Sequence, residues 1–277
     1  MSVQNAQSAT VRLTGGVYIP QLGLGVWQTP RGEVTREAVR TALRVGYRHI
    51  DTASAYGNEA DVGAAVRESG LTRSQVFVTS KLWNDDQGYD ATLRAFDASL
   101  KRTGLEYLDL YLLHWPVAGK RRESWRALEK LHAEGRVHAI GVSNFLLPHL
   151  RELLEHAKVA PTINQLELTP FLQRRDTVEF CRAHQILLEA YSPLTRGERL
   201  SDARLVAIAE RVERSPAQVL LRWGLQHGFV VLPKSTRAER IEENARIFDF
   251  TLDEAAMTLL DGMEENLVTG WDPARQR

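Results

Sequence analysis

The chain has 277 residues, 43% of them hydrophobic, and its 35 basic and 35 acidic side chains give a formal net charge of +0. This balance excludes the basic footprint of a nucleic-acid-binding protein, and the length suits one barrel-sized domain. The polar start MSVQNAQSAT predicts no signal peptide, and no segment approaches the roughly 20 apolar residues of a membrane span. The single cysteine, Cys181, excludes an intrachain disulfide and predicts a buried thiol. We therefore expect a cytoplasmic protein.

Short β-rich runs alternate with amphipathic helical patterns along the chain. Residues 1–10 are polar and are expected to be flexible, and Val11 to Pro20, with Gly15-Gly16 at its centre, predicts a small β-hairpin. Eight candidate strands follow it. They are Gly23 to Trp27, Arg48 to Asp51, Val76 to Leu82, Leu108 to Trp115, Ala139 to Ser143, Thr162 to Glu167, Leu187 to Ser192 and Phe229 to Lys234.

Helical patterns lie between these strands, for example at 33–46, 58–70 and 123–135, and each ends near a glycine. The longer link after Ser192 predicts two helices, the second with Ser215 as N-cap and Pro216 as first helical residue. Strands that alternate with helices form a parallel sheet, and eight such units predict closure into a barrel. The sequence thus predicts one α/β domain over residues 1–277, a (β/α)8 TIM barrel with the hairpin closing its bottom.

Three familiar motifs are incomplete. Gly23-Leu24-Gly25 follows a turn and has Gln28 in the sixth position, so the dinucleotide fingerprint is missing. Gly141-Val142-Ser143 is followed by Phe145, where a nucleophile elbow needs its second glycine. His149 and His156 have no third ligand nearby, and the chain contains neither HExxH nor CxxC. We predict no Rossmann site, no hydrolytic elbow and no metal.

Polar side chains stand at the carboxyl end of one predicted strand after another. Because a barrel gathers these ends at one rim, we expect the side chains to face a common site. In chain order they are Asp51, Lys81, His114, Ser143-Asn144, Gln165, Tyr191-Ser192 and Lys234-Ser235.

Tyr56, in the loop after Asp51, is a candidate acid. A lysine ammonium ~4 Å from a phenol, at an effective dielectric of ~20, favours the phenolate by about 4 kcal/mol, or roughly three pKa units before desolvation offsets part of it. We expect Lys81 to bring the pKa of Tyr56 into a useful range, and Asp51 to keep Lys81 charged. His114 would then orient a carbonyl oxygen beside the phenol. Protonation of a carbonyl is half of a reduction, and the hydride must come from a cofactor because no side chain supplies one.

The segments HIDTASAYGNE, VTSKLW, DLYLLHWP, GVSNF, NQLELTPF, AYSPL and LPKSTRAERIEEN together resemble the aldo-keto reductase superfamily, from about Leu13 to the C-terminal tail. The resemblance implies a (β/α)8 barrel that binds an extended NADPH without a Rossmann motif and reduces aldehydes and ketones to alcohols. The catalytic positions of the family fall on Asp51, Tyr56, Lys81 and His114, with Tyr56 as proton donor.

The resemblance also implies a set of cofactor contacts. They are Ser143, Asn144 and Gln165 at the nicotinamide carboxamide, Tyr191 stacked on the nicotinamide ring, Ser192 and Leu194 beside the pyrophosphate, Lys234, Ser235 and Arg240 around the 2′-phosphate, and Glu243 and Asn244 at the adenine. The residues support the phosphate site independently, since basic side chains near a helix N-terminus suit an anion, although an exposed basic face would look the same. We predict NADPH in preference to NADH.

The chain departs from the family pattern in places. Thr169-Pro170-Phe171 stands where members often have His-Pro-Tyr, and the loop after Pro116 is short. Short loops are similar to those of bacterial 2,5-diketo-D-gluconate reductase-like members and imply an open pocket for small carbonyls such as α-dicarbonyls or keto sugars. The tail, residues 262–277, is expected near this pocket. Its walls are expected to be Trp27, Trp83, His114 and Trp115, although the tryptophans equally fit ordinary packing.

Two alternatives from other classes stay open. One is a catalytically silent NADP(H)-binding regulatory subunit, which would keep the barrel without turnover. The other is a barrel lyase in which Lys81 forms a Schiff base, a role that favours an unpaired lysine. A monomer is the default, because no apolar stretch is left over after the barrel is assigned.

Overall fold

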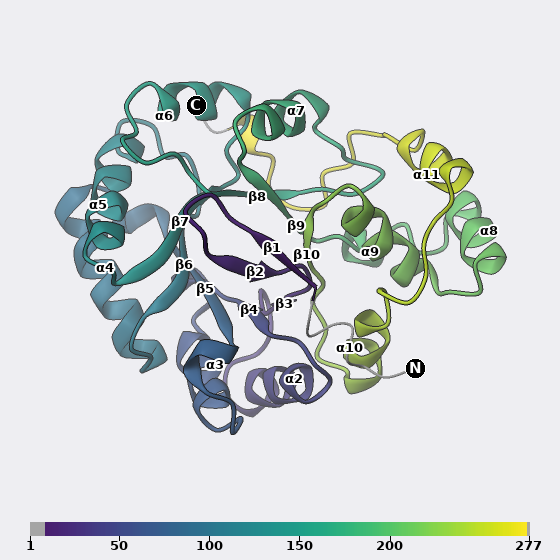
Figure 1. Cartoon of the computed structure of the whole chain (residues 1–277), viewed down its shortest axis with the longest axis horizontal. Helices are drawn as coiled ribbons and strands as arrows, with labels where there is room; N and C mark the ends of the chain where they lie inside the picture. Colours follow the sequence, from purple (N-terminus) through teal and green to yellow (C-terminus); the bar gives the residue numbers. More distant parts are fainter. Residues whose placement is uncertain (1–8, 276–277) are drawn as a thin grey trace.

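The eight predicted strands form one parallel sheet in chain order, ringed by helices, in the computed structural model, which describes residues 9–275 (Figure 1). Every strand pairs with its sequence neighbour, as the alternating pattern predicts. The barrel strands are β3 (Leu24–Gly25), β4 (His49–Asp51), β5 (Phe77–Leu82), β6 (Leu108–Leu113), β7 (Val137–Ser143), β8 (Ile163–Glu167), β9 (Leu187–Tyr191) and β10 (Val230–Leu232). The predicted (β/α)8 barrel is confirmed.

Backbone hydrogen bonds between β3 and β10 bring the two ends of the sheet together. Gly23 N donates to Val231 O at 3.0 Å, and Gly25 N donates to Pro233 O at 3.1 Å. Gly23 has no alternative here, because a Cβ at this position would lie 2.7 Å from Nδ1 of His49. Closure leaves no free edge among the eight barrel strands, all of which lie within residues 9–275, and turns their carboxyl ends toward one rim.

The predicted hairpin is also confirmed. Strands β1 (Thr10–Arg12) and β2 (Tyr18–Pro20) pair antiparallel and lie across the ring of strands in Figure 1. Leu13 and Ile19 pack with barrel-interior residues at the start of several strands, among them Phe77. The hairpin therefore seals the amino-terminal end of the barrel. Residues 1–8, the greater part of the stretch expected to be flexible, lie outside the described residues, as do 276–277 of the tail.

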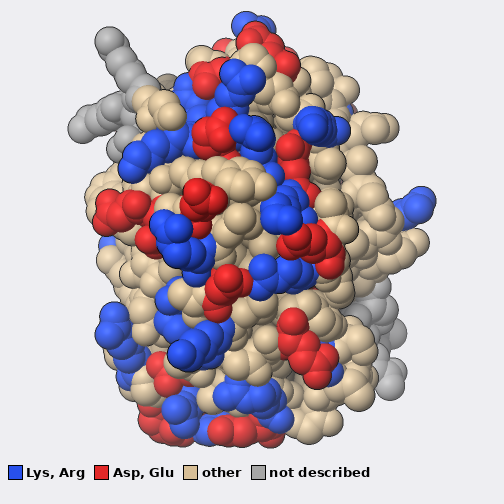
Figure 2. Space-filling view, turned by 90° about the vertical axis from the view of Figure 1, so that its left-hand side faces the viewer, with Lys and Arg blue, Asp and Glu red and all other residues tan. Residues whose placement is uncertain are grey.

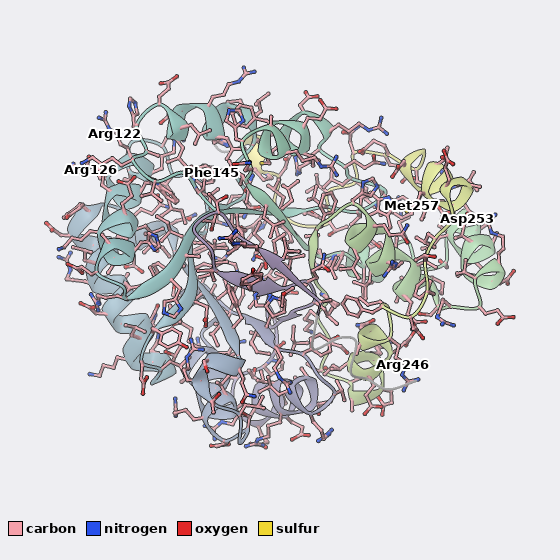
Figure 3. All side chains as sticks on the ribbon, viewed as in Figure 1. Arg122, Arg126, Phe145, Arg246, Asp253 and Met257 are labelled. Carbon is pink, nitrogen blue, oxygen red and sulfur yellow. The ribbon has the colours of Figure 1, made fainter. Side chains whose placement is uncertain are left out.

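Helices cover the outside of the barrel (Figure 1), and side chains fill the space between the helices and the strands (Figure 3). The larger apolar core contains buried residues from both helices and strands. The helices are α2 (Glu33–Arg44), α3 (Glu59–Arg67), α4 (Tyr89–Thr103), α5 (Arg121–Ala133), α6 (Leu147–Leu154), α7 (Arg175–Ala183), α8 (Ala203–Arg211), α9 (Pro216–Gln226), α10 (Ala238–Ala245) and α11 (Glu254–Asp261). Short 3-10 turns are η1 (Ser54–Tyr56), η2 (Arg73–Gln75), η3 (Asn84–Asp86), η4 (Thr195–Gly197) and η5 (Pro273–Arg275).

Local sequence signals explain several helix boundaries. The hydroxyl of Ser215 accepts a hydrogen bond from Gln218 N, and Pro216 begins α9, as predicted. Helix α4 ends at Gly104, whose φ of 60° lies in the left-handed region that favours glycine. On the face shown in Figure 2, acidic and basic side chains are interspersed, which agrees with the net charge of +0. Within residues 9–275, no helix is long and apolar enough to cross a membrane.

Candidate active site

A cleft of about 1160 Å³ opens at the carboxyl ends of the barrel strands. All of the predicted site residues line it except Lys81, which is fully buried behind it. Those on the cleft wall are Asp51, Tyr56, His114, Ser143, Asn144, Gln165, Tyr191, Ser192, Leu194, Lys234, Ser235, Arg240, Glu243, Asn244, Trp27, Trp83 and Trp115. Residues that are far apart in the sequence meet here because parallel strands present their ends to the same rim.

Lys81 connects two of the predicted catalytic residues. Its Nζ donates to Asp51 Oδ1 at 2.6 Å, to Thr52 O at 3.0 Å and to Tyr56 Oη at 3.2 Å. Asp51 ends β4, Lys81 lies in β5, and Tyr56 ends the 3-10 turn η1 that follows β4. These three bonds use all three ammonium hydrogens, so the lysine is fixed in one geometry.

The charge states follow from burial and from these contacts. Burial lowers the pKa of Lys81, but Asp51 and Tyr56 raise it further, so the net pKa lies above its usual value and the ammonium stays charged. Burial raises the pKa of Tyr56, and Lys81 only partly offsets this. The expectation of a phenol with a lowered pKa is therefore wrong, because desolvation of Tyr56 outweighs the charge of Lys81. Tyr56 is a protonated phenol at neutral pH, which is the form a general acid needs.

His114 directly follows β6 and lies against both Tyr56 and Trp83. Its ring centroid is 5.6 Å from that of Tyr56 and 5.2 Å from that of Trp83, in edge-on arrangements. Burial and the nearby Lys81 charge hold the pKa of His114 well below its usual range. The imidazole is therefore neutral near pH 7 and is suited to bind a carbonyl oxygen beside the phenol.

Asn144 fixes the next part of the rim. It adopts a φ of 64°, a left-handed conformation that asparagine tolerates better than most residues. Its Nδ2 donates to His114 O at 3.0 Å and to Ser143 Oγ at 3.1 Å, and its Oδ1 accepts from Tyr191 Oη at 2.8 Å. The predicted carboxamide-binding and ring-stacking positions thus form one hydrogen-bonded unit.

Gln165 also hydrogen-bonds two carboxyl groups of the barrel, which the sequence analysis did not predict. Its Nε2 donates to Asp51 Oδ2 at 2.9 Å and to Glu189 Oε2 at 2.6 Å, and Ser143 Oγ donates to the backbone oxygen of Gln165 at 3.1 Å. Sequence reasoning missed Glu189. A carboxylate in the apolar strand Leu187–Tyr191 was the available signal.

Basic side chains at the far end of the cleft are free to receive an anion. Within residues 9–275, neither Lys234 nor Arg240 has an ion-pair partner, and both line the cleft next to Ser235. At the start of the adjoining loop, Ser192 has a φ of 46°, so the backbone turns sharply where β9 ends. Unpaired cations and a strained polar loop along one cleft fit a phosphate-containing cofactor.

The C-terminal tail forms part of the same cleft. Thr269 donates from its backbone N to Glu167 Oε1 at 3.0 Å and accepts from Arg196 Nη1 at 2.9 Å through its backbone oxygen. The ring centroid of Trp271 lies 6.5 Å from that of Trp83 and 6.1 Å from that of Trp115. The tail was expected near this pocket, but Trp271 was not named as a wall residue and Arg196 was not predicted, because no local pattern indicates which side chains a tail will contact.

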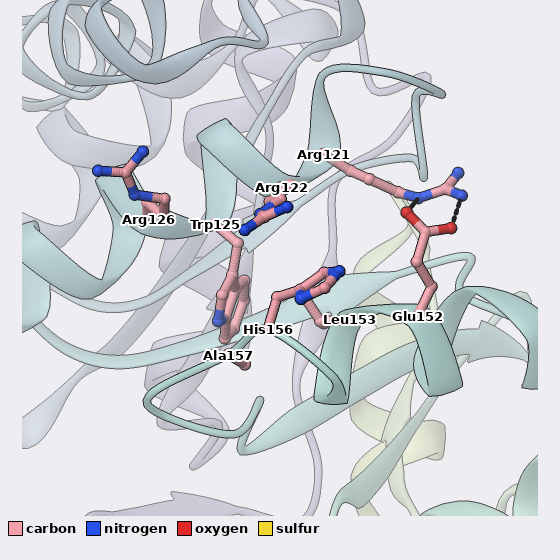
Figure 4. Close-up of a pocket in the computed structure, with 8 residues that line it drawn as sticks. All are labelled: Arg121, Arg122, Trp125, Arg126, Glu152, Leu153, His156 and Ala157. Atoms are coloured by element: carbon pink, nitrogen blue, oxygen red, sulfur yellow. Dashed lines mark hydrogen bonds and ion pairs between the residues drawn. The ribbon is translucent and has the colours of Figure 1, made fainter.

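Two other candidate sites carry no comparable geometry. A hollow of about 10 Å³ lies on the outside of α5 and α6, where Arg121 is already paired with Glu152 beside Trp125 (Figure 4). His149 accepts from Leu146 N at 3.1 Å at the start of α6. Residues 9–275 contain no cluster of three or more His, Cys, Asp or Glu side chains arranged to hold a metal.

A closed (β/α)8 barrel whose rim holds a lysine-bound phenol beside a neutral imidazole has the parts of a carbonyl-reducing oxidoreductase. The comparison with protein families makes the assignment: the Aldo/keto reductase family matches residues 21–265, and the chain belongs to that family. It is an NADP-dependent oxidoreductase.

Similar proteins cover nearly the full length. A glyoxal reductase of Bacillus subtilis is 48% identical over 95% of this chain and 96% of its own. A 9,11-endoperoxide prostaglandin H2 reductase of Trypanosoma cruzi is 50% identical over 97% of this chain and 96% of its own. The structure of a Bombyx mori aldo-keto reductase in complex with NADP superposes with a TM-score of 0.89 at 34% identity, over 95% of each chain.

Proposed function

We propose that this chain reduces small aldehydes, ketones and α-dicarbonyls to alcohols with NADPH, and that Tyr56 is the general acid. One observation carries the proposal: the Tyr56 hydroxyl lies 3.2 Å from the Lys81 ammonium and beside the neutral His114 imidazole at the wall of the cleft. A phenol, a fixed cation and a hydrogen-bonding ring together suit proton transfer to a carbonyl oxygen.

The cleft, of about 1160 Å³, suits the cofactor in size and lining. Asn144, Gln165 and Tyr191 would hold the nicotinamide end, and Lys234 and Arg240 would bind phosphate at the other end through charge-assisted hydrogen bonds. When bound, the nicotinamide supplies the hydride that the carbonyl carbon receives. Side chains of the protein bind the carbonyl oxygen and donate the proton that it receives.

The steps at the carbonyl oxygen follow from the charge states of the surrounding side chains. His114 binds the carbonyl oxygen and orients it toward Tyr56. As negative charge develops on that oxygen, Tyr56 gives up its phenolic proton, because an alkoxide is far more basic than a phenolate. Lys81 stabilises the phenolate left behind, and Asp51, 2.6 Å away, keeps this fully buried lysine charged. The phenolate, which faces the open cleft, then takes a proton from solvent, and this restores the phenol for the next cycle.

Small dicarbonyl substrates have the best support. The 48% identity to a glyoxal reductase favours α-dicarbonyls. Trp27, Trp83 and Trp115 on the cleft wall offer apolar surface with little charge, which suits small carbonyls of several kinds. A Schiff-base role for Lys81 has no such support, since all three of its ammonium hydrogens are engaged and its pKa is raised.

The test follows NADPH oxidation with glyoxal, aromatic aldehydes and keto sugars in the wild type, Tyr56→Phe and Tyr18→Phe. Tyr18 is an exposed hairpin residue at the opposite end of the barrel and serves as the matched control. We expect Tyr56→Phe to lower kcat by about 10²- to 10⁴-fold and Tyr18→Phe to leave it unchanged. Turnover undiminished in Tyr56→Phe would remove the tyrosine from the mechanism.

We also infer that the chain acts as a cytoplasmic monomer. The large exposed apolar side chains of residues 9–275 are few, and two of them, Trp27 and Trp271, line the cleft. The lone thiol is buried, which suits a reducing compartment. Light scattering at micromolar concentration tests the oligomeric state, and a dimer mass would contradict it.

A further inference from the structure

A second buried carboxyl group lies inside the barrel below the predicted catalytic residues. Glu189, in β9, is fully buried, and it does not line the cleft. Its Oε2 accepts from Gln165 Nε2 at 2.6 Å, and the same nitrogen donates to Asp51 Oδ2 at 2.9 Å. Glu189 is therefore one amide group away from the Asp51–Lys81 ion pair.

The cluster contains two carboxyl groups and only one cation. Lys81 already pairs with Asp51 at 2.6 Å. His49, whose Nε2 lies 3.7 Å from Glu189 Oε1, is neutral because burial lowers its pKa to about 3. An ionised Glu189 would be a second negative charge without a counter-ion in a site that excludes water, which is strongly unfavourable.

The geometry leaves one place for a proton. Glu189 Oε1 is buried and has no hydrogen-bond partner within the described part of the chain, whereas Oε2 accepts from Gln165. Burial and the Asp51 charge raise the pKa of Glu189 to about 8, although Gln165 and Lys81 act in the opposite direction. Glu189 is thus protonated at neutral pH.

The hydrogen bond between Gln165 and Glu189 also fixes the orientation of the Gln165 amide. Its amide nitrogen has two hydrogens, and both are donated to carboxyl oxygens, of Asp51 and of Glu189. Only the amide oxygen is left for a ligand in the cleft that Gln165 lines. Without Glu189, one of these anchors is lost and the amide can rotate.

We propose that Glu189 is a positioning residue that carries a proton in the working enzyme, fixes the amide of Gln165, and leaves Asp51 and Lys81 as the only charged pair beneath Tyr56. The inference rests on the proposed function in that Gln165 and Tyr56 serve the cofactor and the carbonyl. The titratable groups that face Glu189 are His49 and Asp51 from β4, Lys81 from β5 and Tyr56 from η1.

Loss of the Glu189 proton has a defined consequence. The new negative charge raises the pKa of Tyr56 further and makes the phenol a weaker acid. The rate of reduction should therefore fall as pH rises through the Glu189 ionisation near 8. A glutamine at this position can accept the same hydrogen bond but cannot ionise, so it should lack this step.

The first test uses the protein without cofactor or substrate. The folded-state pKa of Glu189 lies above the unfolded value, so folding retains a proton that the unfolded chain loses above about pH 4.5. The wild type should lose stability relative to Glu189→Gln as pH rises from 5 to 8, and the difference should level off above pH 8. Glu179→Gln, an exposed position on α7, is the control and should track the wild type. A pH-independent difference between wild type and Glu189→Gln would overturn the proposal.

The second test measures binding and rate separately. Glu189→Gln should match the wild type in kcat within about twofold at pH 6 and exceed it at pH 9. Glu189→Leu, which removes the contact to Gln165, should raise the Kd for NADPH about fivefold at pH 6, measured by fluorescence without a carbonyl substrate. Identical pH–rate profiles in wild type and Glu189→Gln would refute the electrostatic role, and an unchanged Kd in a folded Glu189→Leu would refute the orienting role. If the wild type reduces no carbonyl, the proposed function fails, while the stability and NADPH-binding measurements still decide the role of Glu189.

Discussion

Replacing Lys81 with methionine tests the central interaction of the site. The methionine keeps the apolar stem and removes the charge. In the wild type the ammonium lies 3.2 Å from Tyr56 Oη, and its side chain is fully buried. At an effective dielectric of ~20, two unit charges at this separation interact by about 5 kcal/mol, which is the most the lysine can contribute to stabilising the phenolate. That ceiling corresponds to a rate loss of roughly 10³- to 10⁴-fold.

The assay is steady-state reduction of glyoxal with NADPH, with wild type, Lys81→Met, Tyr56→Phe and the double variant compared. If Lys81 acts through the phenol as proposed, Lys81→Met should lower kcat by about 10²- to 10⁴-fold in the wild-type background but less than about tenfold in Tyr56→Phe. Circular dichroism and thermal melting check folding, because Asp51 is left as a buried unpaired charge whose cost is about 3–5 kcal/mol. Equal losses in both backgrounds, in folded variants, would refute the reasoning that Lys81 works by stabilising the Tyr56 phenolate.

Four further outcomes are expected. Arg240→Ala should raise the Kd for NADPH about tenfold and leave the Kd for NADH unchanged. Arg246, an exposed residue just after α10, is the control, and Arg246→Ala should change neither Kd. Equal weakening of NADPH and NADH binding in Arg240→Ala would contradict a contact to the 2′-phosphate. Trp271→Ala should raise KM for aromatic aldehydes about three- to tenfold more than KM for glyoxal, because the Trp271 ring adjoins Trp83 and Trp115 and can stack on an aromatic substrate. An equal rise in both KM values would count against stacking. Because the pKa of His114 is held well below 6.5, kcat/KM should show no imidazole ionisation near pH 6.5, and a step at that pH that His114→Gln removes would show a charged imidazole. Burial raises the pKa of the Cys181 thiol to about 11, so thiol reagents should modify the native protein at least tenfold more slowly than the unfolded chain, and equal rates would contradict the buried position.

The barrel and its rim were predictable because both follow from local, repeated signals. Alternation of apolar runs with amphipathic stretches fixed the number of strands and their parallel order, and Ser215-Pro216 marked a helix start correctly. Boundaries were accurate to two or three residues, as at α5, predicted as 123–135 and observed as Arg121–Ala133, and at α3, predicted as 58–70 and observed as Glu59–Arg67. Asp51, His114 and Gln165 meet at one cleft for the same reason, since closure of a parallel barrel forces the strand ends together.

The sequence by itself determined the fold class, the family and the set of polar groups at the rim, because a parallel barrel converts periodic spacing in the chain into neighbours in space. Only the tertiary structure decided their protonation and their partners. The pKa of Tyr56 was expected to fall and instead rises, because desolvation depends on how completely the surrounding strands exclude water. Glu189 and Trp271 joined the site through contacts between strands and between loop and tail, which no local pattern encodes. The stretch from Asp51 to Tyr56 thus supplies a phenol and a carboxylate, and the packed barrel around it sets their protonation.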